Sequence, residues 1–218
     1  MQTNIMVKII VGETAISKLK FNFLVKDGFV ENKDTIVFTA NNVIGISMKN
    51  RSTSNSGEFS LGVTSLMGSV ELRDLDGYLF YLTTNKFIGE NIEIRVYDGS
   101  TLLNVFYATK DWEYSNQNKQ VKIELKGKTS FWADISTFGI KYQENLSGYN
   151  LLNQLLAMSN LDAEDFIMSV DVVNYLEKFL FTKAFLSPGT LQEIWNKFCC
   201  ATLLFVYESA GKIVVERF

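Results

Sequence analysis

Three carboxylates lie close together in the sequence, at Glu71, Asp74 and Asp76. Carboxylate oxygens are the ligands that hard cations prefer, and the same group could equally hold a sugar. Asp74, Asp76 and Gly77 match the start of a calcium loop, but the glutamate that completes such a loop is out of register, so this stretch is interpreted as a turn. Glu71 and Asp74 would suit an acid–base hydrolase only if both faced one cleft, about 5 to 10 Å apart.

Two aromatic residues form a second group that could bind a ligand. Trp112 and Tyr114 are two positions apart in a predicted strand, so both side chains lie on one face of it. If both are exposed and adjacent, they form a stacking platform for carbohydrate or a host surface. Trp195 is a third aromatic candidate for an interaction. Cores and subunit interfaces use such residues as well, so packing is the alternative for all three.

Nucleophile and metal chemistry has few candidates in this chain. Histidine is absent from the sequence, which removes Ser–His and Cys–His catalysis and zinc sites built on imidazole. The two cysteines, Cys199 and Cys200, are adjacent and have no further cysteine or histidine to complete a metal site. We therefore predict a protein without catalytic residues, metal ligands or cofactor.

Charge and hydropathy exclude two further classes. The net charge of −3 and the pI near 5.2 disfavour a general nucleic-acid binder, which normally carries a basic patch. Lys122 and Lys126 interleave with apolar residues, as on the solvent face of a strand. No apolar run approaches the roughly 20 residues of a membrane span, and the first residues lack a signal-peptide pattern. Synthesis in the cytoplasm is expected.

The elements that position these residues are predicted to be mainly strands up to residue 128. Period-2 alternation and turn residues, such as Asp98 with Gly99, indicate short strands of regular spacing. This pattern predicts an antiparallel β-barrel or sandwich over residues 1–128. The predicted strands are 5–11, 18–23, 35–40, 43–48, 58–63, 69–73, 78–82, 91–97, 101–107 and 120–125.

The pattern changes to a smaller α/β domain over residues 129–218, so the fold class is α+β. A short helix is predicted over 129–135, and an apolar leucine stripe predicts a helix over 148–158. Residues 170–181 fit a helix or a strand. Thr190 and Glu193 have the spacing of a capping box at the start of a helix over 190–200. A β-hairpin of 203–207 and 212–218 closes the chain.

Three stretches resemble the hub proteins at the tip of bacteriophage tails, a family that includes the barrel-bearing hubs of contractile injection machines. Residues 59–73 resemble an early barrel strand that passes a glycine and then alternates. Residues 89–99, 105–107 and 122–128 are similar to the family's hairpin, its return strand and the strand that enters a short helix after the barrel. The third stretch is the capped helix at 191–194 with the hairpin that ends at 211–215.

The resemblance covers residues 58–218 and implies a structural virion protein without catalysis. It implies a ring of copies, a trimer or hexamer, with the barrel as the ring-building unit at the virion tail tip. The ring's partners would be the tail tube, the distal tail and other tail-tip proteins. Hubs of this family usually continue into a second barrel, so we expect either an N-terminal portion of a longer hub or a reduced relative.

Overall fold

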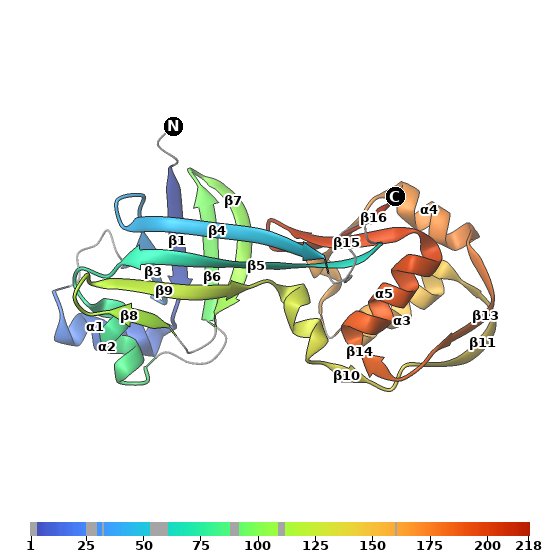
Figure 1. Ribbon diagram of the computed structural model, residues 1–218, viewed down its shortest axis with the longest axis horizontal. Coiled ribbons are helices and arrows are strands. Elements are labelled where there is room, and N and C mark those ends of the chain that lie inside the picture. Colours follow the sequence, from blue (N-terminus) through green and yellow to red (C-terminus); the bar gives the residue numbers. More distant parts are fainter. Residues whose placement is uncertain are drawn as a thin grey trace. The chain divides into compact units, whose positions relative to one another are not determined.

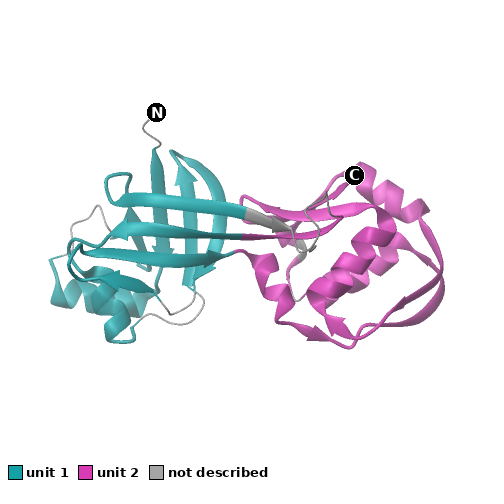
Figure 2. Cartoon of the chain, in the orientation of Figure 1, with its two compact units in different colours: residues 1–49, 67–126 teal, residues 50–66, 127–218 magenta. Residues whose placement is uncertain are grey.

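The computed structural model describes residues 4–24, 30–31, 33–52, 61–87, 92–108, 112–159 and 161–218. They form a mixed α+β protein, as predicted (Figure 1). The chain divides into two compact units: residues 1–49 with 67–126, and residues 50–66 with 127–218 (Figure 2). The units are thus not two consecutive segments. Independent domains at 1–128 and 129–218 stay a prediction.

The first unit is a β-sheet with two helices. Strands pair in the order β2, β3, β1, β6, β7, β9, β5, while β4 pairs with β5 and β8 with β9. These pairings form an open path from β2 to β4, so the described residues form a sheet without closure into a barrel. The strands and helices are β1 (Ile5–Ile10), α1 (Glu13–Asn22), β2 (Val30–Glu31), β3 (Thr35–Phe38), β4 (Val43–Ser52), β5 (Gly62–Arg73), α2 (Tyr78–Thr84), β6 (Ile92–Asp98), β7 (Thr101–Ala108), β8 (Glu113–Ser115) and β9 (Gln120–Lys126).

Within its described residues, the second unit combines a small mixed sheet with three α-helices. Its sheet has the order β12, β16, β15 and the first residues of β5, with parallel outer pairs and an antiparallel β15–β16 hairpin. Two separate ribbons, β10–β14 and β11–β13, complete it. The elements are η1 (Lys128–Ala133, a 3-10 helix), β10 (Ser136–Thr137), β11 (Ile140–Ser147), α3 (Gly148–Met158), η2 (Ala163–Asp165, also 3-10), β12 (Phe166–Met168), α4 (Val170–Lys178), β13 (Leu180–Leu186), β14 (Gly189–Thr190), α5 (Leu191–Thr202), β15 (Leu204–Ser209) and β16 (Lys212–Arg217).

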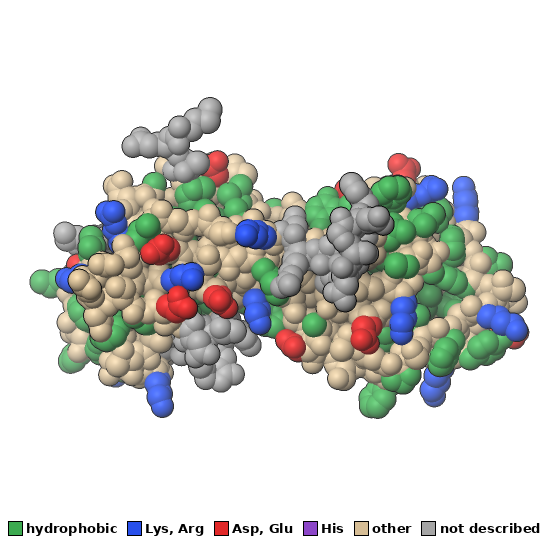
Figure 3. Space-filling model, in the orientation of Figure 1, with side chains coloured by type: hydrophobic (Ala, Val, Ile, Leu, Met, Phe, Trp, Pro, Cys, Tyr) green, Lys and Arg blue, Asp and Glu red, His purple; other side chains and the backbone are tan. Residues whose placement is uncertain are grey.

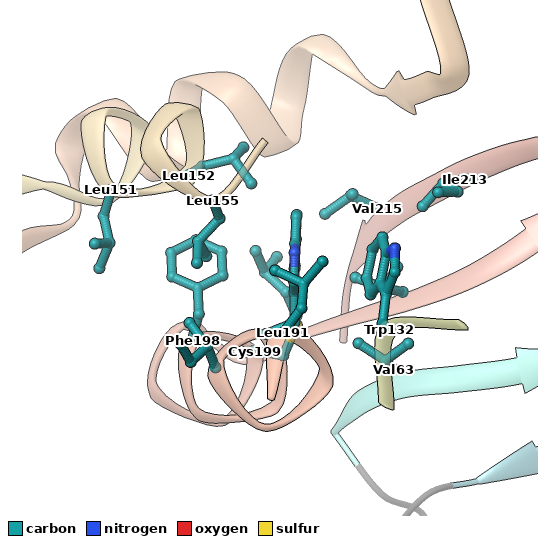
Figure 4. Close-up of a cluster of buried hydrophobic side chains, with 14 of the residues drawn as sticks. Val63, Trp132, Leu151, Leu152, Leu155, Leu191, Phe198, Cys199, Ile213 and Val215 are labelled. Carbon is teal, nitrogen blue, oxygen red and sulfur yellow. The ribbon is translucent and has the colours of Figure 1, made fainter. Parts of the chain in front are cut away.

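The core of the second unit is centred on a stacked tryptophan pair. The rings of Trp132 and Trp195 lie 5.1 Å apart between centroids at 19°, and Phe166 stacks on Trp195 from another element. The indole N–H of Trp195 donates to the buried Ser159 hydroxyl at 3.0 Å. The leucines of α3 face Phe198 of α5 in this core (Figure 4). Burying this much aromatic and aliphatic surface is the main stabilising contribution in the unit.

Several predictions for the second unit are confirmed. The capping box is complete, because the Glu193 amide donates to Thr190 Oγ1 at 3.2 Å and the Thr190 amide donates to Glu193 Oε2 at 3.1 Å. Ser147 caps α3, and the closing hairpin is β15–β16. The ambiguous stretch 170–181 contains both alternatives, since α4 ends at Lys178 and β13 begins at Leu180.

Two predicted strands of the first unit are wrong. Residues 18–23 belong to helix α1, which buries Ala15, Ile16 and Leu19 at helical spacing. The alternating pattern predicts that Phe21 is buried on one face of a strand, but this side chain is 88% exposed. Residues 78–82 begin helix α2, whose first turn is stabilised by the carboxylate of Asp74. In 18–23 a short alternation concealed the helix, whereas 78–82 is a continuous apolar run that fits a strand or a buried helix equally well.

Candidate functional site

A pocket in the first unit lies where the start of α2 meets the β8–β9 turn. Its volume is about 200 Å³. The antiparallel pairing of β5 with β9 places Arg73 opposite Gln120, so the turn after β5 and the turn before β9 are neighbours. The Asp74 amide donates to the Lys119 carbonyl at 2.9 Å and joins the two turns. The side chains that carry the chemistry of the pocket are Asp74, Asp76, Phe80, Tyr114, Asn116 and Lys119.

Asp74 forms the buried base of this pocket and caps α2. Gly77, at φ 72°, precedes the helix and has no side chain to cap it. The Asp74 carboxylate replaces that cap, accepting from the amides of Leu79 at 3.2 Å and Phe80 at 3.0 Å. Burial raises the pKa of Asp74, and the nearby Asp76 adds to the rise, while the amides of α2 oppose it. Both oxygens of Asp74 are therefore used to hold the first turn of α2 in place.

One wall of the pocket is aromatic. Phe80 and Tyr114 meet edge to face, with ring centroids 5.4 Å apart at 80°. The Tyr114 hydroxyl is held 2.6 Å from Thr83 Oγ1, and burial raises the pKa of Tyr114. Phe80 remains 41% exposed, so part of its ring is open to a ligand. Tyr114 therefore holds the Phe80 ring in place, and Phe80 forms the part of the wall that is open to solvent.

The rim of the pocket carries a cation. Lys119 has φ 50° and is exposed, and its Nζ donates to the Leu75 carbonyl at 3.3 Å. Asp76 is exposed nearby. Charges of both signs thus line one small cavity.

The structure brings some of the predicted residues together and separates others. Asp74, Asp76 and Tyr114 meet in the pocket, whereas Glu71 lies on β5 opposite Lys122 and does not line it. Trp112 is only 8% exposed, and its indole N–H has no partner within the described part of the chain. Trp195 is fully buried in the second unit. The stacking platform needed Trp112 and Tyr114 exposed, and this condition is not met.

The other pocket residues were missed by the sequence analysis. Phe80 lies on α2, and Asn116 and Lys119 lie in the β8–β9 turn, and no short motif connects these two segments. The signal that could have found them is the pairing of the strands on either side. Once β5 and β9 are antiparallel neighbours, both turns must lie at the same end of the sheet.

The two cysteines differ in their surroundings. Cys199 is buried, and burial raises the pKa of its thiol, with Cys200 adding to the rise. Cys200 is exposed and its thiol donates to the Leu61 carbonyl at 3.6 Å. Over the described ranges of the chain, no three Cys, Asp or Glu side chains are grouped to hold a metal ion. Within the same ranges, no helix is long and apolar enough to cross a membrane.

The β11–β13 ribbon of the second unit is a candidate interaction surface. Within the described chain its strands pair only with each other. Its inner side chains join the core, while Tyr142 and Phe185 are exposed, the latter at 60%. Phe138, just before β11, is fully exposed. Figure 3 shows one face of the chain, on which hydrophobic side chains are exposed over both units. Grouped aromatic side chains at the surface are typical of contact sites.

Comparisons with known proteins show a shared fold. No family model and no curated protein matches the sequence. Among solved structures, the 43 kDa tail protein of prophage MuSo2 from Shewanella oneidensis matches 99% of this chain with a TM-score of 0.54 at 11% identity. The two proteins share a fold.

A second tail protein, from Neisseria meningitidis MC58, matches 78% of this chain at 10% identity with a TM-score of 0.49. The matches cover 55% of the Shewanella chain and 50% of the Neisseria chain. This chain thus spans about half the length of the tail proteins that it matches. At 11% identity the likeness to the Shewanella protein concerns the fold alone.

Proposed function

We propose that this chain is a structural component of a phage-like tail, located at the virion tail tip. The observation that carries the proposal is the fold likeness over 99% of the chain to a prophage tail protein. In this proposal the chain is a hub: it assembles with copies of itself into a trimeric or hexameric ring around the tail axis. The ring joins the tail tube and distal tail proteins to the tip, and no catalytic step is assigned to the chain.

Two further observations support a role in assembly. The exposed aromatic side chains of the β11–β13 ribbon offer a surface for protein contacts in the second unit. Asp74, the buried carboxylate of the pocket between α2 and the β8–β9 turn, is held by the amides of Leu79 and Phe80, which agrees with a structural role. Ring closure requires heterologous contacts with a fixed rotation between copies, which suits a protein with distinct surfaces on its units.

The proposal is tested on phage-like particles produced by cells that carry the gene for this chain. Tailed particles and tail-less heads are separated on a density gradient, and peptides of the chain are quantified in each by mass spectrometry. We expect the peptides in the tailed fraction and not in the tail-less heads. Peptides in neither fraction, or in both at equal amounts, would overturn the proposal.

A further inference from the structure

The pocket between α2 and the β8–β9 turn has a lining that selects among ligand classes. Asp74 and Asp76 place carboxylates in it, and Lys119 places an ammonium group at its rim. Both oxygens of Asp74 already accept from the amides of Leu79 and Phe80, so the charged groups left to meet a ligand are Asp76 and Lys119, which have opposite signs. A ligand of strong single charge is attracted by one and repelled by the other, so the charges favour a neutral ligand.

The polar side chains of the pocket supply both kinds of hydrogen-bonding group. Asp76 accepts hydrogen bonds, Lys119 donates them, and the amides of Asn116 and Gln120 do both. Since a hydroxyl group also donates and accepts, a neutral ligand with several hydroxyls can satisfy this lining. Exposed Asp76, Asn116 and Lys119 remain accessible from solvent.

The aromatic wall and the volume narrow the ligand further. Phe80 presents part of its ring, and the edge-to-face contact with Tyr114 holds that ring in place. An aromatic face next to hydrogen-bonding groups suits the apolar face of a sugar ring as well as its hydroxyls. The volume of about 200 Å³ lies below the roughly 300–1,000 Å³ of sites for drug-sized ligands. The cavity therefore has room for one ring and not for an oligosaccharide.

We propose that this pocket binds one neutral sugar ring of a glycan. The residues that make the contact are Phe80, Asn116 and Asp76, with Lys119 at the rim, and Asp74 positions the helix that carries Phe80. Trp112 has no part in the site, because it is buried outside the pocket lining. The inference goes beyond a role in tail assembly and does not depend on it.

The test is saturation-transfer NMR on the full chain with four probes: D-glucose, D-galactose, N-acetyl-D-glucosamine and L-rhamnose. We expect transfer to at least one sugar, with a dissociation constant that rises about three- to tenfold in Phe80→Leu and in Asn116→Ala. Phe138→Leu, an exposed phenylalanine in the second unit, is the matched control and should leave the constant unchanged.

Three results would overturn the inference. The first is no transfer to any of the four sugars. The second is binding that Phe80→Leu and Asn116→Ala leave unchanged. The third is tighter binding of tetramethylammonium or inorganic phosphate than of every sugar, which would show a charged ligand. Because the measurement uses the isolated chain, none of these results bears on whether the chain belongs to a tail.

Discussion

Glu208 is the buried carboxylate on which the start of η1 depends. It lies on β15, and its oxygens accept from the amides of Lys128 at 2.9 Å and Thr129 at 2.7 Å, and from the Thr129 hydroxyl. Gly127 is required beside it, since a Cβ there would lie 2.5 Å from the carboxylate oxygens. Burial raises the pKa of Glu208, and the hydrogen bonds from Thr129 and Lys128 oppose the rise.

Replacing Glu208 by alanine leaves the amides of Lys128 and Thr129 without their acceptor, while the Thr129 hydroxyl keeps the Thr64 carbonyl at 3.3 Å. Each buried unsatisfied group costs about 1–3 kcal/mol, so we expect Glu208→Ala to lower the free energy of unfolding by more than about 2 kcal/mol. Urea unfolding followed by tryptophan fluorescence measures this in a Trp112→Phe background, where only Trp132 and Trp195 report. Glu177→Ala, at an exposed position on α4, should stay within about 0.5 kcal/mol. Equal effects of the two substitutions would contradict this account.

The raised pKa of Glu208 predicts the sign of a pH effect. The folded-state pKa lies above its ordinary value of 4.5, so protonation favours the folded state. The stability linked to this proton is fully present below about pH 4.5 and is lost as the pH rises through the folded-state pKa. Glu208→Gln cannot titrate. We therefore expect the stability of the wild type relative to Glu208→Gln to fall as the pH rises above 4.5 in urea unfolding series. If the wild type instead becomes more stable relative to Glu208→Gln as the pH rises, the hydrogen bonds that favour the carboxylate outweigh the burial that disfavours it.

At the scale of elements, helix α5 holds the first residues of β5 through one row of side chains. Asn196 accepts from the Val63 amide at 2.8 Å, and Gln192 donates to Ser65 at 3.2 Å. Cys200 continues the row with its contact to the Leu61 carbonyl. Residues four apart on α5 thus contact residues two apart on β5. The spacing matches because a helix rises about 1.5 Å per residue and a strand about 3.3 Å, so the two steps have nearly the same length.

Gly62 is the position where this contact is tightest. It has φ +139°, and a Cβ would lie 2.7 Å from Asn196 Oδ1. We expect Gly62→Ala to destabilise the second unit by about 1–3 kcal/mol. Asn196→Ala also destabilises, because it removes the acceptor of the Val63 amide. The double variant removes the clash, so its cost should be less than the sum of the two single costs. Gly45→Ala, where a Cβ meets nothing within 4 Å, is the control in chemical denaturation. Strict additivity would refute the contact.

The β11–β13 ribbon supports a prediction about assembly. We expect Tyr142→Ser with Phe185→Ser to reduce the amount of chain that co-purifies with tails at least about tenfold, because exposed aromatics often dominate interface energies. The control pair, Val170→Ser with Phe218→Ser, changes two apolar side chains off the ribbon that are even more exposed, at 74% and 75%. Thermal unfolding checks that both double variants stay folded. Equal recovery of both pairs with tails would exclude the ribbon as a contact.

Elements that are encoded locally could be predicted from the sequence. The capping box of Thr190 and Glu193 and the β15–β16 hairpin depend on residues a few positions apart, and both are confirmed. Residues 18–23 were misassigned because a short alternating pattern fits a helix as well as a strand. The sequence indicates Asp74 and Tyr114 only as separate candidates. They become neighbours through the pairing of β5 with β9, which no local pattern encodes.

For the molecule as a whole, the proposed tail role rests on a fold shared with a tail protein and on surfaces suited to contact. The shared fold spans 99% of this chain at 11% identity, so the pattern of strands and helices is kept where the side chains differ. A sequence search finds no such likeness, because neither a family model nor a curated protein matches. The proposed tail role therefore depends on where copies of the chain lie in a particle.

The most direct test is a cryo-EM reconstruction of the tail end of particles produced by cells that carry the gene for this chain. We predict density that both compact units fit, repeated three or six times in a closed ring around the tail axis, between the tail tube and the tip. Density for the chain at the capsid, or as single copies away from the axis, would contradict the proposed role as a ring-forming hub at the tail tip.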